Sequence, residues 1–94
     1  MMNTNTSTMG WRSATGEAIQ GWLTRRIAES IGSKPEDIDV TVSFAYYGLD
    51  SVAALGISGD LSNWLGRKLS PTLTWDYPNI ESLAAHLADE ARDE

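Results

Sequence analysis

The sequence predicts an all-α fold of three long helices and one short helix, with a long loop between the first two. Apolar residues recur three or four positions apart in three separate stretches, which is the spacing of amphipathic helices. Capping residues or glycines bound these stretches. The 94 residues, 41% of them hydrophobic, provide for one small core. We therefore expect a single helical bundle.

The first helix is predicted from about Thr15 to Gly32. Its buried face is expected to consist of Ile19, Leu23, Ile27 and Ile31. Residues 1–14 are largely polar and show no periodicity, so they are predicted to form a flexible leader.

Residues 33–47 are predicted to form the long loop. The alternation from Ile38 to Phe44 imitates a strand, but a lone strand would lack a pairing partner. We favour an ordered loop whose Ile38, Val40 and Phe44 reach the core, and keep the strand as the alternative.

The second helix is predicted over residues 51–65, opened by Asp50-Ser51 and stopped by Gly66. Residues 71–77 leave room for one short helix before Pro78, and Asn79 caps the last helix. The inward stripe of the second helix is predicted as Leu55, Ser58, Leu61 and Leu65, and that of the last as Ile80, Leu83, Leu87 and Ala91. The predicted core comprises Leu23, Ile27, Phe44, Leu55, Leu61, Leu65, Leu83 and Leu87. The folded domain is expected to span 15–91, with an acidic tail over 92–94.

The net charge of −6 argues against binding to nucleic acid or to anionic membranes, because both require a basic surface. The chain contains no cysteine, which excludes disulfides and thiolate chemistry. It also lacks the apolar run of about 20 residues that a membrane-spanning helix requires. We expect a cytoplasmic domain that is monomeric in isolation. A domain this small seldom encloses an enzyme pocket, so carrying or binding is favoured over catalysis.

The segment from Tyr47 to Val52 is the candidate functional site of the sequence. A glycine-bearing turn places Ser51 at the start of a helix, where unpaired N–H groups and the helix dipole favour an anion such as a phosphodiester. Taken by itself, the same Asp50-Ser51 pair is also compatible with a simple helix cap.

Gly48-Leu49-Asp50-Ser51 resembles the G-x-D-S attachment motif of acyl carrier proteins. The flanking segments also resemble this family, and specifically its polyketide-synthase branch, from about residue 17 to residue 90. The flanking matches are Trp22-Leu23, Ile27-Ala28, Asp37-Ile38, Phe44, Leu69-Ser-Pro-Thr-Leu and Asp76-Tyr77-Pro78-Asn79-Ile80.

The resemblance implies an acyl-carrier-protein-like four-helix bundle with a 4′-phosphopantetheine arm on Ser51. In the family, an acidic neighbour such as Asp50 helps a phosphopantetheinyl transferase position its metal. The arm carries acyl groups as thioesters to acyl-loading, ketosynthase and other acyl-processing domains of polyketide or hybrid polyketide/nonribosomal peptide biosynthesis. The resemblance implies neither a catalytic residue nor a resident metal. A peptidyl carrier domain and an unmodified helical docking domain remain as alternatives.

The second helix departs from many fatty-acid carriers because it contains Gly56 and Gly59 and few acidic residues. We therefore expect partners to contact Leu49 and Val52, with Asp50 and Asp60 as secondary electrostatic contacts.

The remaining polar and aromatic candidates are assigned structural roles. His86 is expected to be a solvated helix residue, and a Ser51-His86-Asp76 hydrolase is disfavoured because no strand–elbow–helix context surrounds the serine. Core or rim packing is favoured over a ligand-stacking platform for Trp22, Trp64, Trp75 and Tyr77.

Overall fold

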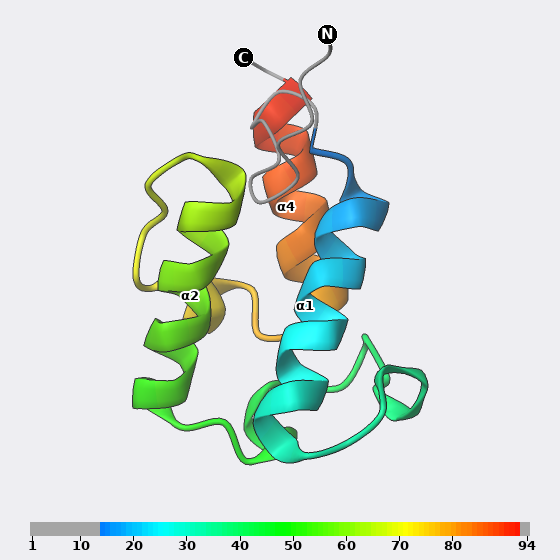
Figure 1. Ribbon diagram of the computed structural model, residues 1–94. Coiled ribbons are helices and arrows are strands. Elements are labelled where there is room, and N and C mark those ends of the chain that lie inside the picture. The colour runs from blue at the N-terminus through cyan, green and yellow to red at the C-terminus, as the bar shows by residue number, and fades with distance from the viewer. Residues whose placement is uncertain (1–13, 93–94) are drawn as a thin grey trace, which may run out of the picture.

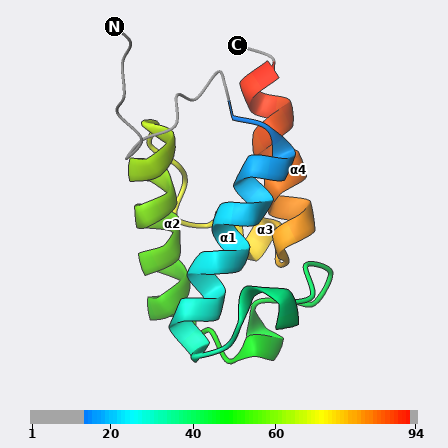
Figure 2. The same ribbon diagram turned by 45° about the vertical axis from the view of Figure 1, so that its right-hand side comes forward.

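The computed structural model describes residues 14–92, which form a bundle of four α-helices. In chain order these are α1 (Gly16–Ile31), α2 (Ser51–Leu65), α3 (Leu73–Asp76) and α4 (Ile80–Arg92). Two 3₁₀ turns, η2 (Pro35–Asp37) and η3 (Ala45–Tyr47), lie in the loop between α1 and α2. Helix α1 runs antiparallel to both α2 and α4 (Figures 1 and 2) and contacts both of them. The predicted all-α fold is confirmed.

The helix ends follow the signals in the sequence. Thr15 caps α1 by accepting the N–H of Ala18 at 3.0 Å, and Asn79 Oδ1 accepts the N–H of Ser82 at 2.8 Å at the start of α4. Gly32 and Gly66 end α1 and α2 in the left-handed conformation, with φ of 70° and 72°. Glycine reaches this region without the Cβ clash that other residues meet.

The core lies where α1, α2 and α4 meet, and it contains every predicted core residue except Leu55. The most completely buried side chains are Ile19, Leu23, Ile27, Leu61, Leu65, Ile80, Leu83 and Leu87. The prediction for Leu55 is wrong: this side chain is 49% exposed. Ile31, expected on the buried face of the first helix, is exposed at the end of α1. The buried face of α2 is set by Ile57, Leu61 and Leu65, and Ala54 rather than Leu55 continues it towards the N-terminus.

The loop prediction is confirmed. Phe44 is buried, and Ile38 and Val40 pack partly buried against the core. The loop is tied to the start of α4 by backbone hydrogen bonds from Phe44 N–H to Pro78 O (2.8 Å) and from Glu81 N–H to Val40 O (3.0 Å). Within residues 14–92 the pairing of this loop amounts to an isolated bridge with Asn79, not a strand.

A two-part contact braces α1 against α2. Trp22 and Trp64 stack with ring centroids 5.4 Å apart, and Arg26 donates to one carboxylate oxygen of Asp60 from Nε (3.0 Å) and Nη2 (2.9 Å). These tryptophans therefore have the packing role that was predicted. The ion pair is partly exposed, so it contributes at most about 1 kcal/mol.

His86 departs from its prediction as a solvated residue. Its ring stacks on Tyr77 with centroids 4.1 Å apart, and its Nε2 lies 3.4 Å from a carboxylate oxygen of Glu90. This contact joins α4 to the segment that follows α3.

The predicted leader, residues 1–14, lies outside the described residues except for Ala14, which is buried in the core. In the predicted tail, Arg92 is the last residue of α4, and residues 93–94 lie outside the description. Among the described residues, no helix is both long and apolar enough to cross a membrane.

Candidate functional site

Ser51 is the first residue of α2, and Asp50 is its N-cap. The Asp50 Oδ1 accepts the backbone N–H of Ala53 at 2.9 Å. The hydroxyl of Ser51 is exposed and has no hydrogen-bond partner among residues 14–92. Capping is therefore carried out by Asp50, which leaves the Ser51 hydroxyl available for reaction.

The loop before Ser51 is fixed by its own hydrogen bonds. Gly48 adopts a φ of 79°, and its N–H donates to Ala45 O at 2.9 Å. The Tyr47 hydroxyl accepts the N–H of Asp39 at 2.6 Å and donates to the Asp39 carbonyl at 3.2 Å. These contacts hold the segment that delivers Ser51 to the surface.

Asp39 is itself tied to Thr41. Its Oδ1 accepts the Thr41 hydroxyl at 2.7 Å and the Thr41 N–H at 2.9 Å. The hydroxyl bond, followed by the backbone bond, lowers the pKa of the Asp39 carboxyl, because both stabilise its charged form.

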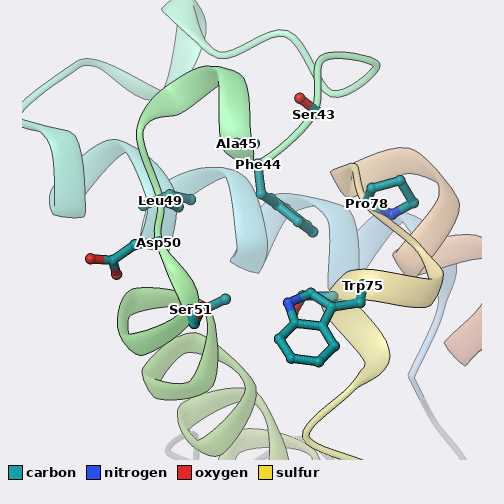
Figure 3. A pocket seen from close by; sticks show the side chains of 10 residues that line it. Ser43, Phe44, Ala45, Leu49, Asp50, Ser51, Trp75 and Pro78 are labelled. Atoms are coloured by element: carbon teal, nitrogen blue, oxygen red, sulfur yellow. The ribbon is translucent and has the colours of Figure 1, made fainter.

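A groove of about 460 Å³ opens beside Ser51, between the start of α2 and α3. In Figure 3, Trp75 lies across the groove from Ser51 and Phe44 points towards it from the loop before α2, whereas Asp50 points away from it. The groove is lined by Ser43, Phe44, Ala45, Leu49, Asp50, Ser51, Ala54, Thr74, Trp75 and Pro78. Sequence reasoning did not identify it, because α3 comes next to Ser51 only through the fold.

The predicted partner-surface residues differ in their settings. Val52 is 77% exposed, and Leu49 is half-buried against the core and lines the groove. Asp60, expected as a secondary electrostatic contact, is half-exposed and is paired with Arg26. A further exposed apolar side chain, Trp75, stands at the edge of the groove.

The hydrolase constellation is not assembled. The contacts of His86 are with Tyr77 and Glu90, and within the described chain no hydrogen bond links it to Ser51 or Asp76. Among these residues there is also no cluster of three or more histidine or acidic side chains that could hold a metal ion.

Comparison with known proteins agrees with this geometry. A family model described as the phosphopantetheine attachment site matches residues 21–87. Over 77 residues the chain is 42% identical to a phenolphthiocerol/phthiocerol polyketide synthase of Mycobacterium tuberculosis, a match covering 81% of this chain and 4% of that protein. Polyketide synthase PksM of Bacillus subtilis is 32% identical over 72 residues, covering 77% of this chain and 2% of that protein. The chain thus spans only a small part of these relatives.

Two solved structures share the fold. An acyl carrier protein from Anabaena sp. PCC 7120 is 37% identical with a TM-score of 0.79, covering 95% of this chain and 99% of that one. A free-standing peptidyl carrier protein from Acinetobacter baumannii is 38% identical with a TM-score of 0.77, covering 83% of this chain and 98% of that one. The chain therefore belongs to the phosphopantetheine-binding carrier family, as a non-catalytic acyl carrier domain related to the carrier segments of polyketide synthases.

Proposed function

We propose that Ser51 is the residue that receives the phosphopantetheine arm. The proposal rests on the different roles of two adjacent residues. Asp50 caps α2, whereas the Ser51 hydroxyl is exposed and has no hydrogen-bond partner within residues 14–92. A phosphodiester at this position would lie at the positive end of the α2 dipole. Nothing in the local fold would have to be broken to attach it.

In the attachment reaction, coenzyme A supplies the phosphopantetheine group and the transferase catalyses its transfer. The Ser51 oxygen bonds to the phosphorus that bears the pantetheine, the bond from that phosphorus to the bridging oxygen breaks, and adenosine 3′,5′-bisphosphate leaves. The serine proton passes to a base on the transferase. The role of Asp50 in positioning the transferase metal is part of this proposal, and the exposure of Asp50 is compatible with it.

The test is the intact mass of the protein after incubation with coenzyme A, magnesium and a broad-specificity transferase. The wild type should gain one phosphopantetheinyl unit, and Ser51→Ala should gain none. Ser43→Ala is the matched control, because Ser43 lines the same groove yet its hydroxyl is engaged by the N–H of Tyr46. This control should be modified like the wild type. Modification of Ser51→Ala would refute the assignment.

We further propose that partner enzymes dock on the apolar surface around Ser51, with Val52 as the central contact. Val52, Leu55 and Trp75 are exposed apolar side chains on α2 and α3, the two helices that border the groove. Anchors that become fully buried carry most binding energy, whereas rim charges mainly tune association rate and salt dependence. The transferase and acyl-loading, ketosynthase and other acyl-processing domains are the proposed partners.

Val52→Asp should therefore slow arm attachment much more than Asp60→Asn, with both variants folded. The measurement is the initial rate of modification across a salt series. A larger effect of Asp60→Asn with a steep salt dependence would refute docking through the apolar surface.

The proposed cargo is an acyl group held as a thioester, passed between enzymes of polyketide or hybrid pathways. Similarity to a peptidyl carrier protein favours aminoacyl or peptidyl cargo as the second candidate. Loading assays on the modified protein distinguish acyl cargo from aminoacyl or peptidyl cargo. The modified protein is incubated in parallel with acyl transferases of polyketide synthases and with adenylation domains, and the loading rate is measured for each. Loading by the adenylation domains in preference to the acyl transferases would favour the second candidate.

A further inference from the structure

The turn before Ser51 presents an aromatic side chain at the surface. Tyr46 lies in η3 and is 77% exposed. Its ring meets the ring of Tyr47 edge to face, with centroids 5.7 Å apart and 81° between the ring planes, which is a favourable geometry for two aromatic rings. A single exposed apolar side chain is ordinary on a protein surface. Tyr46 differs because it packs against a ring that is itself held in place.

Tyr47 is held by its hydroxyl group. The hydroxyl accepts the N–H of Asp39 at 2.6 Å and donates to the Asp39 carbonyl at 3.2 Å, so it pairs with both backbone groups of one residue. The Asp39 carboxylate in turn accepts the hydroxyl and the N–H of Thr41. The Thr41 carbonyl accepts the side-chain amide of Asn79 at 3.4 Å, at the start of α4. The two tyrosines are therefore connected through the loop to α4, and the Tyr46 ring rests on a fixed base.

Tyr46 is also near Ser51. Tyr46 is five positions earlier in the chain, so even an extended chain would place their Cα atoms at most about 18 Å apart. The hydrogen bond from Gly48 N–H to Ala45 O closes the turn between them and shortens this distance. A standard protein interface covers about 800 Å² of each partner, which is a patch roughly 30 Å across. A patch of this size centred on Ser51 extends to the turn that carries Tyr46.

We propose that Tyr46 is a docking contact for the phosphopantetheinyl transferase, and that Tyr47 is the positioning residue that holds it in place. This inference rests on the proposed attachment at Ser51. The transferase is the occupant that the chemistry favours, because it must bring the phosphorus of its substrate to the Ser51 oxygen itself. Acyl-processing domains react with the thioester at the far end of the arm, so they need not cover the turn. A tyrosine that is held before binding loses little conformational freedom on docking, which makes it an effective anchor.

The test measures the initial rate of arm attachment over a range of carrier concentrations. Tyr46→Ala removes the ring, Tyr46→Phe keeps it, and Tyr47→Phe removes the hydroxyl that holds Asp39. Tyr77→Phe is the matched control, because it also removes a tyrosine hydroxyl, but one that has no hydrogen-bond partner among residues 14–92. Circular dichroism checks that each variant is folded, and NMR measures the hydrogen-exchange rate of the Asp39 amide.

Tyr46→Ala should raise the KM for the carrier about tenfold and leave kcat unchanged, because the ring contributes to docking and does not touch the reacting atoms. Tyr46→Phe and Tyr77→Phe should behave like the wild type. Tyr47→Phe should raise KM about threefold, because the Tyr46 ring must then be ordered on docking. The Asp39 amide of this variant should exchange about fivefold faster, as the loss of one net hydrogen bond implies.

A wild type that gains no mass would overturn the proposed attachment together with this inference. A wild type that is modified, with an unchanged KM in Tyr46→Ala, would overturn this inference alone. An equal loss in Tyr46→Phe would overturn the role of the ring. Faster Asp39 exchange in Tyr47→Phe with the KM of the wild type would show a purely structural hydroxyl and overturn the positioning role.

The alternative occupant is tested on the same variant. Tyr46→Ala is converted fully to the phosphopantetheine form by long incubation, and its loading by acyl transferases is compared with that of the wild type. Equal loading rates are expected. Slower loading combined with normal attachment would assign Tyr46 to an acyl-processing partner and overturn the proposal.

Discussion

The contrast between Leu61 and Leu55 tests the packing of α2 most directly. Both are leucines on one helix, but Leu61 is 1% exposed and Leu55 is 49% exposed. Leu61→Ala removes atoms from a closed core and leaves a cavity, so it should lower the free energy of unfolding by about 2–5 kcal/mol. Leu55→Ala removes atoms that are half in water and leaves no cavity. Its cost should be about 0.5–1 kcal/mol, partly offset by the better helix propensity of alanine.

The assay is urea unfolding followed by circular dichroism for the two variants and the wild type. Thermal melts of the same proteins give a second measurement. In a domain of this size each 1 kcal/mol shifts the melting temperature by roughly 4–8 °C, so a difference of at least about 1 kcal/mol should make Leu61→Ala melt at least about 4 °C below Leu55→Ala. The slope of the unfolding free energy against urea should stay constant, which shows that only stability has changed. Similar destabilisation by both substitutions would mean that Leu55 packs in the core and that this placement of the α2 face is incorrect.

Three further predictions concern glycines, an acidic loop residue and the helix brace. Gly59→Ala should raise the free energy of unfolding by about 0.5–1 kcal/mol, because the added Cβ meets open space and alanine is the better helix former. Gly48→Ala should lower it by about 1–2 kcal/mol, because Gly48 has a positive φ of 79°. Thermal melts should therefore show a higher melting temperature for Gly59→Ala and a lower one for Gly48→Ala. The Asp39 carboxyl should titrate below its ordinary pKa of 3.8 in a carboxyl-carbon NMR experiment, and Thr41→Val should move the midpoint upward. Equal titration midpoints in the wild type and Thr41→Val would contradict this assignment. Because the folded-state pKa is lowered, the stability that Asp39 contributes is present above pH 3.8 and is lost as the pH falls through the lowered pKa. Asp60→Asn breaks an exposed ion pair between α1 and α2, so it should cost less than about 1 kcal/mol in urea unfolding, and a larger loss would show that the brace is essential to the fold.

The helix boundaries could be predicted because their causes are local. A side-chain cap at Thr15, Asp50 or Asn79 and a glycine at position 32 or 66 act within one turn of the helix that they bound. The resemblance of Gly48-Leu49-Asp50-Ser51 to an attachment motif could be seen for the same reason, since these residues are adjacent in sequence.

The face of α2 could not be predicted from periodicity. This helix carries apolar residues on its outer side, at Val52 and Leu55, as well as on its inner side, at Ile57 and Leu61. When both sides are apolar, the spacing rule fits more than one rotation of the helix. Packing against α1 and α3 decides which face is buried, and it leaves Leu55 half-exposed.

Contacts between residues that are distant in the sequence could not be predicted from the sequence pattern either. Asp60 is paired with an arginine 34 residues earlier, so its charge is shared with α1 before any partner arrives. The environments of His86 and Thr74 likewise depend on how α3 and its following segment meet the rest of the bundle. No spacing rule connects residues that only the fold brings together.

The placement of Asp50 before Ser51 has a consequence for how a carrier can work. Because the helix cap belongs to Asp50, modification or substitution of Ser51 leaves the first turn of α2 intact. The loop is fixed independently by Gly48 and by the hydrogen bond from Phe44 N–H to Pro78 O. Under the proposed attachment at Ser51, we therefore expect the presenting surface to be the same before and after the arm is attached. We then expect a partner to recognise one surface in every loading state, with the states differing only in the arm and its cargo. Binding to such a preorganised surface requires little ordering of the carrier, which favours rapid exchange between successive partners.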